Sequence, residues 1–197
     1  MTDLNTLLIV VHEIYGVNRH MEEVCRAYRE AGFDVICPNL LNRETPFSYS
    51  EESTAYRNFM DNVGFDGATE KVKSIVSQYK DQYEQIFIIG FSVGATIAWR
   101  CSEDENLNGV VGYYGSRIRE YLEVTPTCPV LLFFPEQEPT FNVDETIEIL
   151  IGQGHLVYQF KGKHGFSDPF SSCYGESSAH QASVKIAEFI GRNWIKI

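Results

Sequence analysis

The chain contains the stretch Gln85-Ile-Phe-Ile-Ile-Gly-Phe-Ser-Val-Gly-Ala-Thr-Ile-Ala-Trp99, in which an apolar run leads into Gly90-x-Ser92-x-Gly94 and then into a helix-forming segment. This order predicts a strand, a sharp turn and a helix, with the serine hydroxyl exposed at the turn. Glycines suit the two flanking positions because a side chain there would collide with the neighbouring strand and helix. Free N–H groups at the start of the helix would face an oxyanion formed on the serine. A serine that only caps the helix is the alternative, but the flanking pattern favours a nucleophile.

Outward from this segment, short apolar runs alternate with segments of helical periodicity along the whole chain. The expected strands are 6–11, 33–37, 85–89, 109–113, 130–134 and 156–160, and the expected helices are about 19–31, 52–62, 66–80, 94–103, 142–153 and 178–194. Several of the apolar runs are continuous, which is typical of strands buried on both faces of a parallel sheet. The pattern therefore predicts an α/β fold with a mainly parallel, doubly wound sheet, in one domain spanning residues 1–197.

Composition and charge argue against several classes of partner. The 197 residues carry a net charge of −11, and no basic stripe is present that could neutralise the phosphates of a nucleic acid or bind an anionic membrane. Five scattered cysteines without a CxxC pair indicate reduced thiols. No signal peptide is apparent, and no apolar run approaches the roughly 18 residues of a membrane span. We therefore expect a cytoplasmic protein with neither nucleic acid nor membrane as a partner.

A serine is a weak nucleophile unless a base takes its proton and a third group orients that base. Three histidines follow Ser92 in the chain: His155, His164 and His180. His155 opens an apolar strand and His180 falls at the start of the last helix, where structural or solvated roles are expected. His164 lies in a glycine-flanked loop directly after a strand, so we predict it as the base.

The acid is expected on the loop that follows strand 130–134, where Glu136, Glu138 and Asp144 are the candidates. Glu138 is favoured, four residues beyond that strand and next to a proline that stiffens the turn. Asp144 is expected to begin the next helix, where a carboxylate has a structural explanation. The sequence leaves open which of Glu138 and Asp144 serves.

Two backbone N–H groups are expected to form an oxyanion hole. Val93 follows the nucleophile and supplies one, and Ile14, in the loop after strand 6–11, supplies the other. Asn18 would cap the helix that follows this loop. The irregular stretch 39–52 is the longest in the chain, and its Leu41, Phe47 and Tyr49 are equally compatible with a cleft wall or with surface cover.

Four ordered motifs resemble the dienelactone hydrolase family. They are Val11-His-Glu-Ile-Tyr-Gly-Val-Asn18, Gly90-Phe-Ser-Val-Gly94, Gly112-Tyr-Tyr-Gly115 and Lys163-His-Gly-Phe166, and the segment 26–39 is similar to the first helix and following strand of that family. The resemblance covers nearly the whole chain. It implies an α/β-hydrolase fold of about six or seven strands, trimmed at the N-terminus and without a large cap domain.

The resemblance also implies a site. Its nucleophile would be Ser92, its base His164, its acid Glu138 and its oxyanion donors Ile14 and Val93. Glu13 matches a family glutamate thought to influence protonation of the nucleophile. Tyr56 and Tyr114 are placed with it as residues that bind substrate or modulate the site.

Two departures from the family bear on the substrate. The founding enzymes use a cysteine nucleophile, whereas this chain has Ser92, which favours ordinary esters. Their substrate-binding arginines align with Glu52 and Asp168, and two acids would repel an anionic substrate. Tyr56 and Arg57 could restore some anion binding.

The sequence therefore predicts a serine hydrolase for a small ester, lactone or thioester, acting as a monomer or small homo-oligomer. A non-catalytic binding protein on the same scaffold, or an acyltransferase or peptidase with the same triad, is the alternative. Neither an HExxH pattern nor a phosphate-binding loop is present, so no metal and no cofactor are expected.

Overall fold

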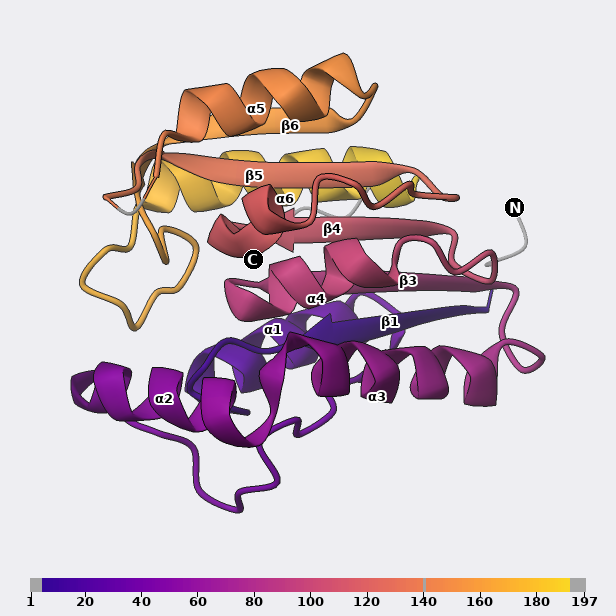
Figure 1. Cartoon of the computed structure of the whole chain (residues 1–197). Coiled ribbons are helices and arrows are strands. Elements are labelled where there is room, and N and C mark those ends of the chain that lie inside the picture. Colours follow the sequence, from indigo (N-terminus) through magenta and orange to yellow (C-terminus); the bar gives the residue numbers. More distant parts are fainter. Residues whose placement is uncertain (1–4, 140, 192–197) are drawn as a thin grey trace.

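The computed structural model describes residues 5–139 and 141–191, which form one six-stranded sheet covered by helices on both faces (Figure 1). The strands are β1 (Thr6–Val11), β2 (Asp34–Ile36), β3 (Gln85–Phe91), β4 (Gly109–Tyr113), β5 (Val130–Gln137) and β6 (Leu156–Lys163). They lie in the order β2-β1-β3-β4-β5-β6, and every neighbouring pair is parallel. The predicted α/β fold with a parallel sheet is confirmed, with six strands.

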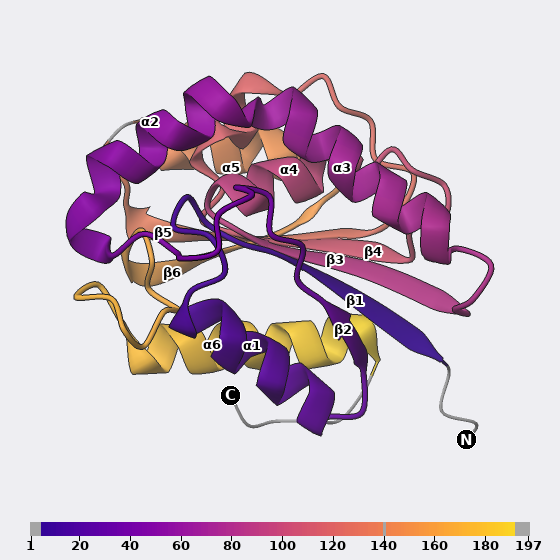
Figure 2. The same cartoon turned by 90° about the horizontal axis from the view of Figure 1, so that it is seen from below.

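The helices divide between the two faces, as Figure 2 shows. They are α1 (Arg19–Glu30), α2 (Glu52–Asn62), α3 (Gly64–Tyr79), α4 (Val93–Cys101), α5 (Val143–Gly152) and α6 (Glu176–Ile190), with short 3-10 turns at Tyr49–Glu51 and Ser116–Glu120. α1 and α6 cover one face over one apolar cluster, and the other four helices cover the opposite face over a second cluster. The sheet is thus doubly wound, and its strands are apolar on both sides because both sides are buried.

Local sequence explains where the helices begin and end. The side chain of Asn18 accepts a hydrogen bond from the N–H of Met21 and caps α1, as predicted, and Asn142 caps α5 in the same way. Gly191, with φ 77°, ends α6 in the left-handed conformation that glycine adopts readily. The expected helix 178–194 therefore starts two residues earlier, and its last residues, 192–194, lie outside the described part of the chain.

The last two strands are longer than their apolar runs suggest. β5 continues through polar residues to Gln137, and β6 continues to Lys163, with an irregularity in their pairing between Pro135 and Gln137. Glu138 consequently follows its strand directly, and the expected four-residue spacing is wrong. Apolar pattern misses this extension because the backbone pairing continues where the side chains are already exposed.

All strands end on the same side of the sheet, which is on the left in Figure 1. Helix α2 and the loop between β6 and α6 lie on this side too. Ligands of open α/β sheets bind at the carboxyl ends of the strands.

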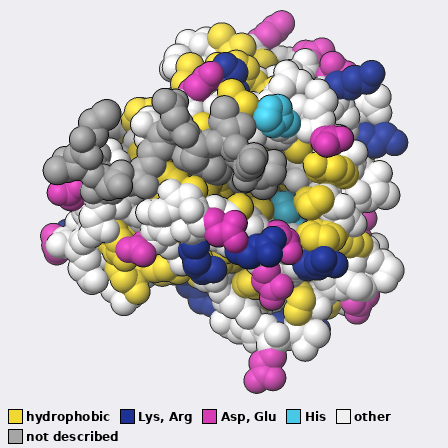
Figure 3. Space-filling view, turned by 180° about the vertical axis from the view of Figure 1, so that it is seen from behind, with side chains coloured by type: hydrophobic (Ala, Val, Ile, Leu, Met, Phe, Trp, Pro, Cys, Tyr) yellow, Lys and Arg dark blue, Asp and Glu magenta, His cyan; other side chains and the backbone are white. Residues whose placement is uncertain are grey.

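The face seen in Figure 3 carries Lys and Arg side chains interspersed with Asp and Glu, outside the part covered by grey atoms. None of the helices in the described ranges combines the length and apolar character that a bilayer crossing requires.

Candidate active site

Ser92 lies at the sharp turn between β3 and α4. Its φ of 54° and ψ of −116° are rare for a residue with a side chain, and its hydroxyl makes no capping hydrogen bond to α4. A Cβ atom at Gly90 would lie 2.1 Å from the carbonyl oxygen of Gly94, and one at Gly94 would lie 2.2 Å from that of Val11. The two glycines let the strand and the helix approach closely, and the turn presents the serine hydroxyl rather than using it as a cap.

A chain of two hydrogen bonds leads away from this hydroxyl. The Ser92 Oγ is 2.9 Å from the His164 Nε2, and the His164 Nδ1 is 2.8 Å from a Glu138 carboxylate oxygen. The Glu138 side chain is only 6 % exposed, whereas that of His164 is 35 % exposed. A buried carboxylate that orients the imidazole, and an imidazole that reaches a hydroxyl, form the geometry of an activated nucleophile.

The other candidate acids and histidines have different environments. Asp144 is at the start of α5, where its carboxylate accepts a hydrogen bond from Gln159. Glu136 is an exposed residue of β5 that lines the same cleft as Ser92. His155 packs edge-on against Trp99, and His180 is exposed on α6. Of the candidate acids, Glu138 is the one whose carboxylate is hydrogen-bonded to His164.

The ring of Tyr114 packs against the imidazole of His164. The centroids of its ring and that of His164 are 4.9 Å apart, and its hydroxyl shares a hydrogen bond of 3.0 Å with Ser167. Its backbone has a positive φ of 43°, and its N–H donates to the carbonyl of Phe133 at 2.7 Å. Burial raises the pKa of the Tyr114 hydroxyl well above its ordinary value, so it remains a hydrogen-bond donor. Tyr114, which was expected to bind substrate or modulate the site, is buried and contacts His164.

A cleft of about 1120 Å³ opens over Ser92 and His164. Ile14 and Val93 both line it, on the loop after β1 and at the start of α4. No acceptor for the Ile14 N–H is found among the described residues. Two backbone N–H groups near a nucleophile can stabilise an oxyanion.

Two buried acids lie side by side beneath this cleft. Burial, followed by the neighbouring Asp168 charge, raises the pKa of Glu13 to about 7, against the smaller opposite effects of His164 and of a hydrogen bond with Tyr114. Asp168 accepts hydrogen bonds from the Tyr49 hydroxyl at 2.5 Å and from the Phe170 N–H at 2.8 Å. Glu13 is therefore partly protonated near neutral pH.

His20 adjoins the same two acids. Its Nδ1 lies 3.7 Å from an Asp168 oxygen, and burial lowers its pKa to about 4, so the ring is neutral. One ligand atom from each of Glu13, His20 and Asp168 lies within 4.8 Å of the others.

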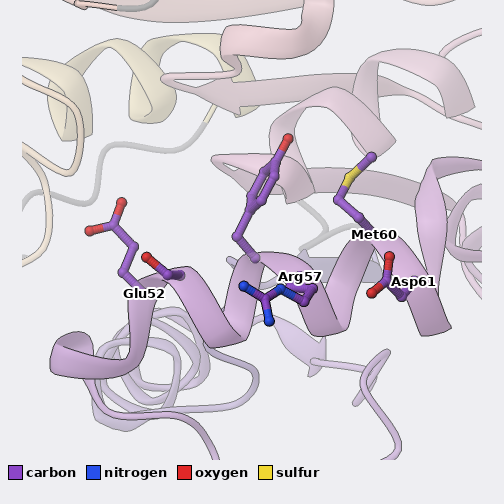
Figure 4. A pocket seen from close by; sticks show the side chains of 6 residues that line it. Glu52, Arg57, Met60 and Asp61 are labelled. Atoms are coloured by element: carbon purple, nitrogen blue, oxygen red, sulfur yellow. The ribbon is translucent and has the colours of Figure 1, made fainter.

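The polar residues of α2 divide between the cleft and the outer surface. Tyr56 and Glu52 line the cleft, and the Tyr56 hydroxyl accepts a hydrogen bond of 2.6 Å from Arg117. Arg57 lies instead in a shallow hollow on α2 with Met60 and Asp61 (Figure 4). Of the two residues that could restore anion binding, Tyr56 lines the cleft and Arg57 is not among the lining residues.

The stretch 39–52 also divides. Leu41 and Phe47 are buried in the core, whereas Tyr49 lines the cleft. Sequence reasoning missed several other lining residues, namely Tyr15, Thr96, Arg117, Lys163, Phe170 and Cys173. Tyr15, which adjoins Ile14 in the expected oxyanion loop, and Lys163, which adjoins His164, carried a signal in the sequence.

The chain is similar to known proteins both in sequence and in fold. The model of the dienelactone hydrolase family matches residues 5–193. The protein YczH of Bacillus subtilis (strain 168) is 45 % identical over 168 residues, which are 84 % of this chain and 82 % of YczH. The carboxymethylenebutenolidase of Pseudomonas putida is 22 % identical over 202 residues, covering 93 % of this chain and 84 % of the relative. Among solved structures, the dienelactone hydrolase-like promiscuous phosphotriesterase P91 from metagenomic libraries has a TM-score of 0.76 at 14 % identity, covering 97 % and 87 % of the two chains.

Proposed function

Because this chain belongs to the dienelactone hydrolase family and is thus an α/β-fold hydrolase, we propose that it hydrolyses small esters, lactones or thioesters through an acyl-enzyme on Ser92. The observation that carries the proposal is the hydrogen-bonded chain from Ser92 through His164 to Glu138, with distances of 2.9 and 2.8 Å. The family supplies the class of reaction, and the chain of contacts supplies the residues. A serine in this setting is activated only while the imidazole is neutral.

In the first half of the reaction, the Ser92 oxygen attacks the acyl carbon as His164 Nε2 takes the hydroxyl proton. The carbonyl oxygen becomes negative and is stabilised by the N–H groups of Ile14 and Val93, at about 3–4 kcal/mol per donor. Collapse of this intermediate breaks the bond to the leaving alcohol or thiol. The imidazolium returns its proton to that leaving group, and the acyl group remains on Ser92.

In the second half, a water molecule attacks the acyl carbon while His164 accepts one of its protons. The second tetrahedral intermediate collapses, the acid leaves and the proton returns to the Ser92 oxygen. Glu138 does not exchange protons in either step. Its carboxylate holds the Nδ1–H and stabilises the positive imidazolium, which forms twice in each turnover.

The test is a burst-phase assay with p-nitrophenyl acetate and butyrate from pH 5 to 9. We expect turnover to be lower at the acidic end of this range, because only a neutral imidazole can accept the serine proton. We also expect it to fall by about 10⁴-fold or more in Ser92→Ala, and by about 10³- to 10⁴-fold in Glu138→Gln. Asp144→Asn is the matched control, because that carboxylate contacts Gln159 and not His164. It should retain the wild-type rate.

The outcomes separate the candidate functions. Turnover of Ser92→Ala at the wild-type rate would refute the proposed nucleophile. If no burst and no covalent phosphonate adduct on Ser92 form with folded protein, a non-catalytic binding protein is favoured instead. Acyl transfer and peptide cleavage share the acyl-enzyme. Adding alcohols or amines as acceptors to the same assay reveals acyl transfer, and replacing the ester by an amide or peptide substrate reveals peptide cleavage.

A further inference from the structure

The charges that line the cleft are mostly negative. Its lining contains five carboxylates and two basic side chains: Glu13, Glu52, Glu136, Glu138 and Asp168 against Arg117 and Lys163. Arg117 already pairs with Glu120 and donates to the Tyr56 hydroxyl. Within residues 5–139 and 141–191, no Lys or Arg forms an ion pair with Glu13, Glu52 or Asp168. The part of the lining formed by Glu13, Glu52 and Asp168 therefore carries negative charge that no Lys or Arg of the described residues neutralises in an ion pair.

Aromatic rings are interleaved with these acids. The rings of Tyr15 and Tyr49 meet edge to face with centroids 4.9 Å apart, and the Tyr49 hydroxyl donates to Asp168. Tyr15 lines the cleft with Glu52, Glu13 and Asp168, and burial first and these three charges next raise the pKa of its hydroxyl. At the rim, the guanidinium of Arg19, which is not a lining residue, already stacks 4.4 Å over the ring of Phe170. Rings beside carboxylates attract cations through both their faces and the charge.

His20 does not offset the charge. The residue is 1 % exposed, its Nδ1 faces Asp168 at 3.7 Å, and this nitrogen has no hydrogen-bond partner. Burial keeps the ring neutral, with a pKa lowered to about 4. The group Glu13, His20 and Asp168 is thus rich in acceptors and contains no cationic side chain, and water screens the two buried carboxylates poorly.

From this arrangement we propose that the cleft selects substrates with a positively charged group, an alkylammonium or quaternary ammonium, which binds against Tyr15, Tyr49 and Glu52 while Ser92 attacks the acyl carbon. The inference rests on the proposed function for its chemistry and goes beyond it in naming the charge of the substrate. The positive group balances Glu52 directly and Asp168 and Glu13 at longer range. An anionic group in the same place would be repelled by all three.

The experiment compares three thioacetates of similar size in buffer with EDTA, so that no metal ion occupies the acids. They are acetylthiocholine, its neutral isostere 3,3-dimethylbutyl thioacetate, and the anionic 3-(acetylthio)propanesulfonate. We expect kcat/KM to be at least tenfold higher for the cation than for the isostere, and higher for the isostere than for the anion. The ratio should shrink as NaCl increases, because salt screens the attraction.

Glu52→Gln and Glu148→Gln, which remove one negative charge each, show where in the protein the effect arises. Glu52→Gln should lower the cation-to-isostere ratio several-fold, and Glu52→Lys should lower it further. Glu148→Gln, an exposed position on α5 outside the cleft lining, should leave the ratio and the basal rate unchanged. An equal ratio in Glu52→Gln and Glu148→Gln would refute the role of Glu52.

A binding measurement makes the test independent of turnover. Titration calorimetry compares choline with 3,3-dimethylbutanol on wild type and on Ser92→Ala, and choline should bind more tightly to both. If all three thioesters react equally and choline has no advantage, the charge selection is refuted while the hydrolase stands. If no thioester reacts but choline still binds selectively at Glu52, the proposed function fails and the cation site stands.

Discussion

At the scale of single residues, the main electrostatic feature is a carboxyl group held where its ionised form is costly. Glu13 is 5 % exposed and adjoins Asp168, and its pKa is raised to about 7 by burial first and by that neighbour second. In the unfolded chain the same group would titrate near its ordinary pKa of 4.5. Between these two pH values the folded protein holds a proton that the unfolded chain releases.

This difference has a definite sign. The folded state binds more protons from about pH 4.5 to 7, so the contribution of Glu13 to stability falls as pH rises through that window and is constant above it. We predict that Glu13→Gln gains about 3 kcal/mol of unfolding free energy relative to wild type between pH 4.5 and 7.5. Urea unfolding of both proteins at several pH values measures the gain. Buried His12 and His20 titrate in both proteins and cancel in the difference, so parallel curves would contradict the prediction.

At the scale of elements, the site depends on how closely α4 approaches the sheet. The backbone of Gly94 lies against the end of β1, so that an added Cβ would come within 2.2 Å of the Val11 carbonyl oxygen and 2.7 Å of the His12 carbonyl oxygen. These are backbone atoms of a central strand and cannot move alone. The separation of α4 and β1 therefore sets the relative positions of Ser92 and the Ile14 loop.

We predict that Gly94→Ala destabilises the protein by about 2–3 kcal/mol through overpacking and reduces turnover more than stability alone explains. Gly67→Ala in α3 is the matched control, because no atom lies within 4 Å of a Cβ there and the position is helical. It should stabilise the protein by about 1 kcal/mol and leave turnover unchanged. Thermal unfolding and p-nitrophenyl acetate hydrolysis on both variants give the comparison. Equal stability of the two variants would show that α4 can move away from β1.

At the scale of the whole molecule, charge is far from balanced. The chain has 27 acidic and 16 basic residues and a net charge of −11, and the ion pairs between Lys or Arg and an acid in the described ranges lie largely on exposed side chains. Exposed pairs contribute little to stability, so repulsion among the excess acids dominates the long-range electrostatics. Burial of the two apolar clusters, one on each face of the sheet, offsets the free-energy cost of this repulsion.

We therefore predict that the melting temperature at pH 7.5 rises between 10 and 200 mM NaCl, by about 2–4 °C for each kcal/mol of repulsion that salt screens. The same salt series near pH 5 is the control, because the sequence pI is about 4.9 and net repulsion vanishes there. Scanning calorimetry at both pH values measures the shift. A salt effect as large at pH 5 as at pH 7.5 would rule out net charge as its cause.

Much of the fold could be predicted because secondary structure and burial leave a local pattern. The continuous apolar run of β3, the glycines around Ser92 and the helical stripe of α6 each report their surroundings within a few residues. The order of strand, turn and helix likewise predicted an exposed Ser92 hydroxyl, and the loop position of His164 singled it out among three histidines. These are short-range properties of the chain.

The tertiary structure alone decided which distant residues meet. Glu138 rather than Asp144 reaches His164 because β5 and β6 pair side by side beyond their apolar runs, so their carboxyl ends lie next to each other. Tyr49 lines the cleft, whereas Phe47 is buried in the core. Tyr56 lines the cleft as well, whereas Arg57 lies in the hollow on α2. By itself the sequence determined the elements and singled out Ser92 and His164 as candidate nucleophile and base, because periodicity and turn chemistry act locally. The contact of Glu138 with His164, the cleft wall and its unbalanced charge depend on contacts across 26 to 119 residues, for which strand order, strand length and helix rotation, not local pattern, are the physical cause.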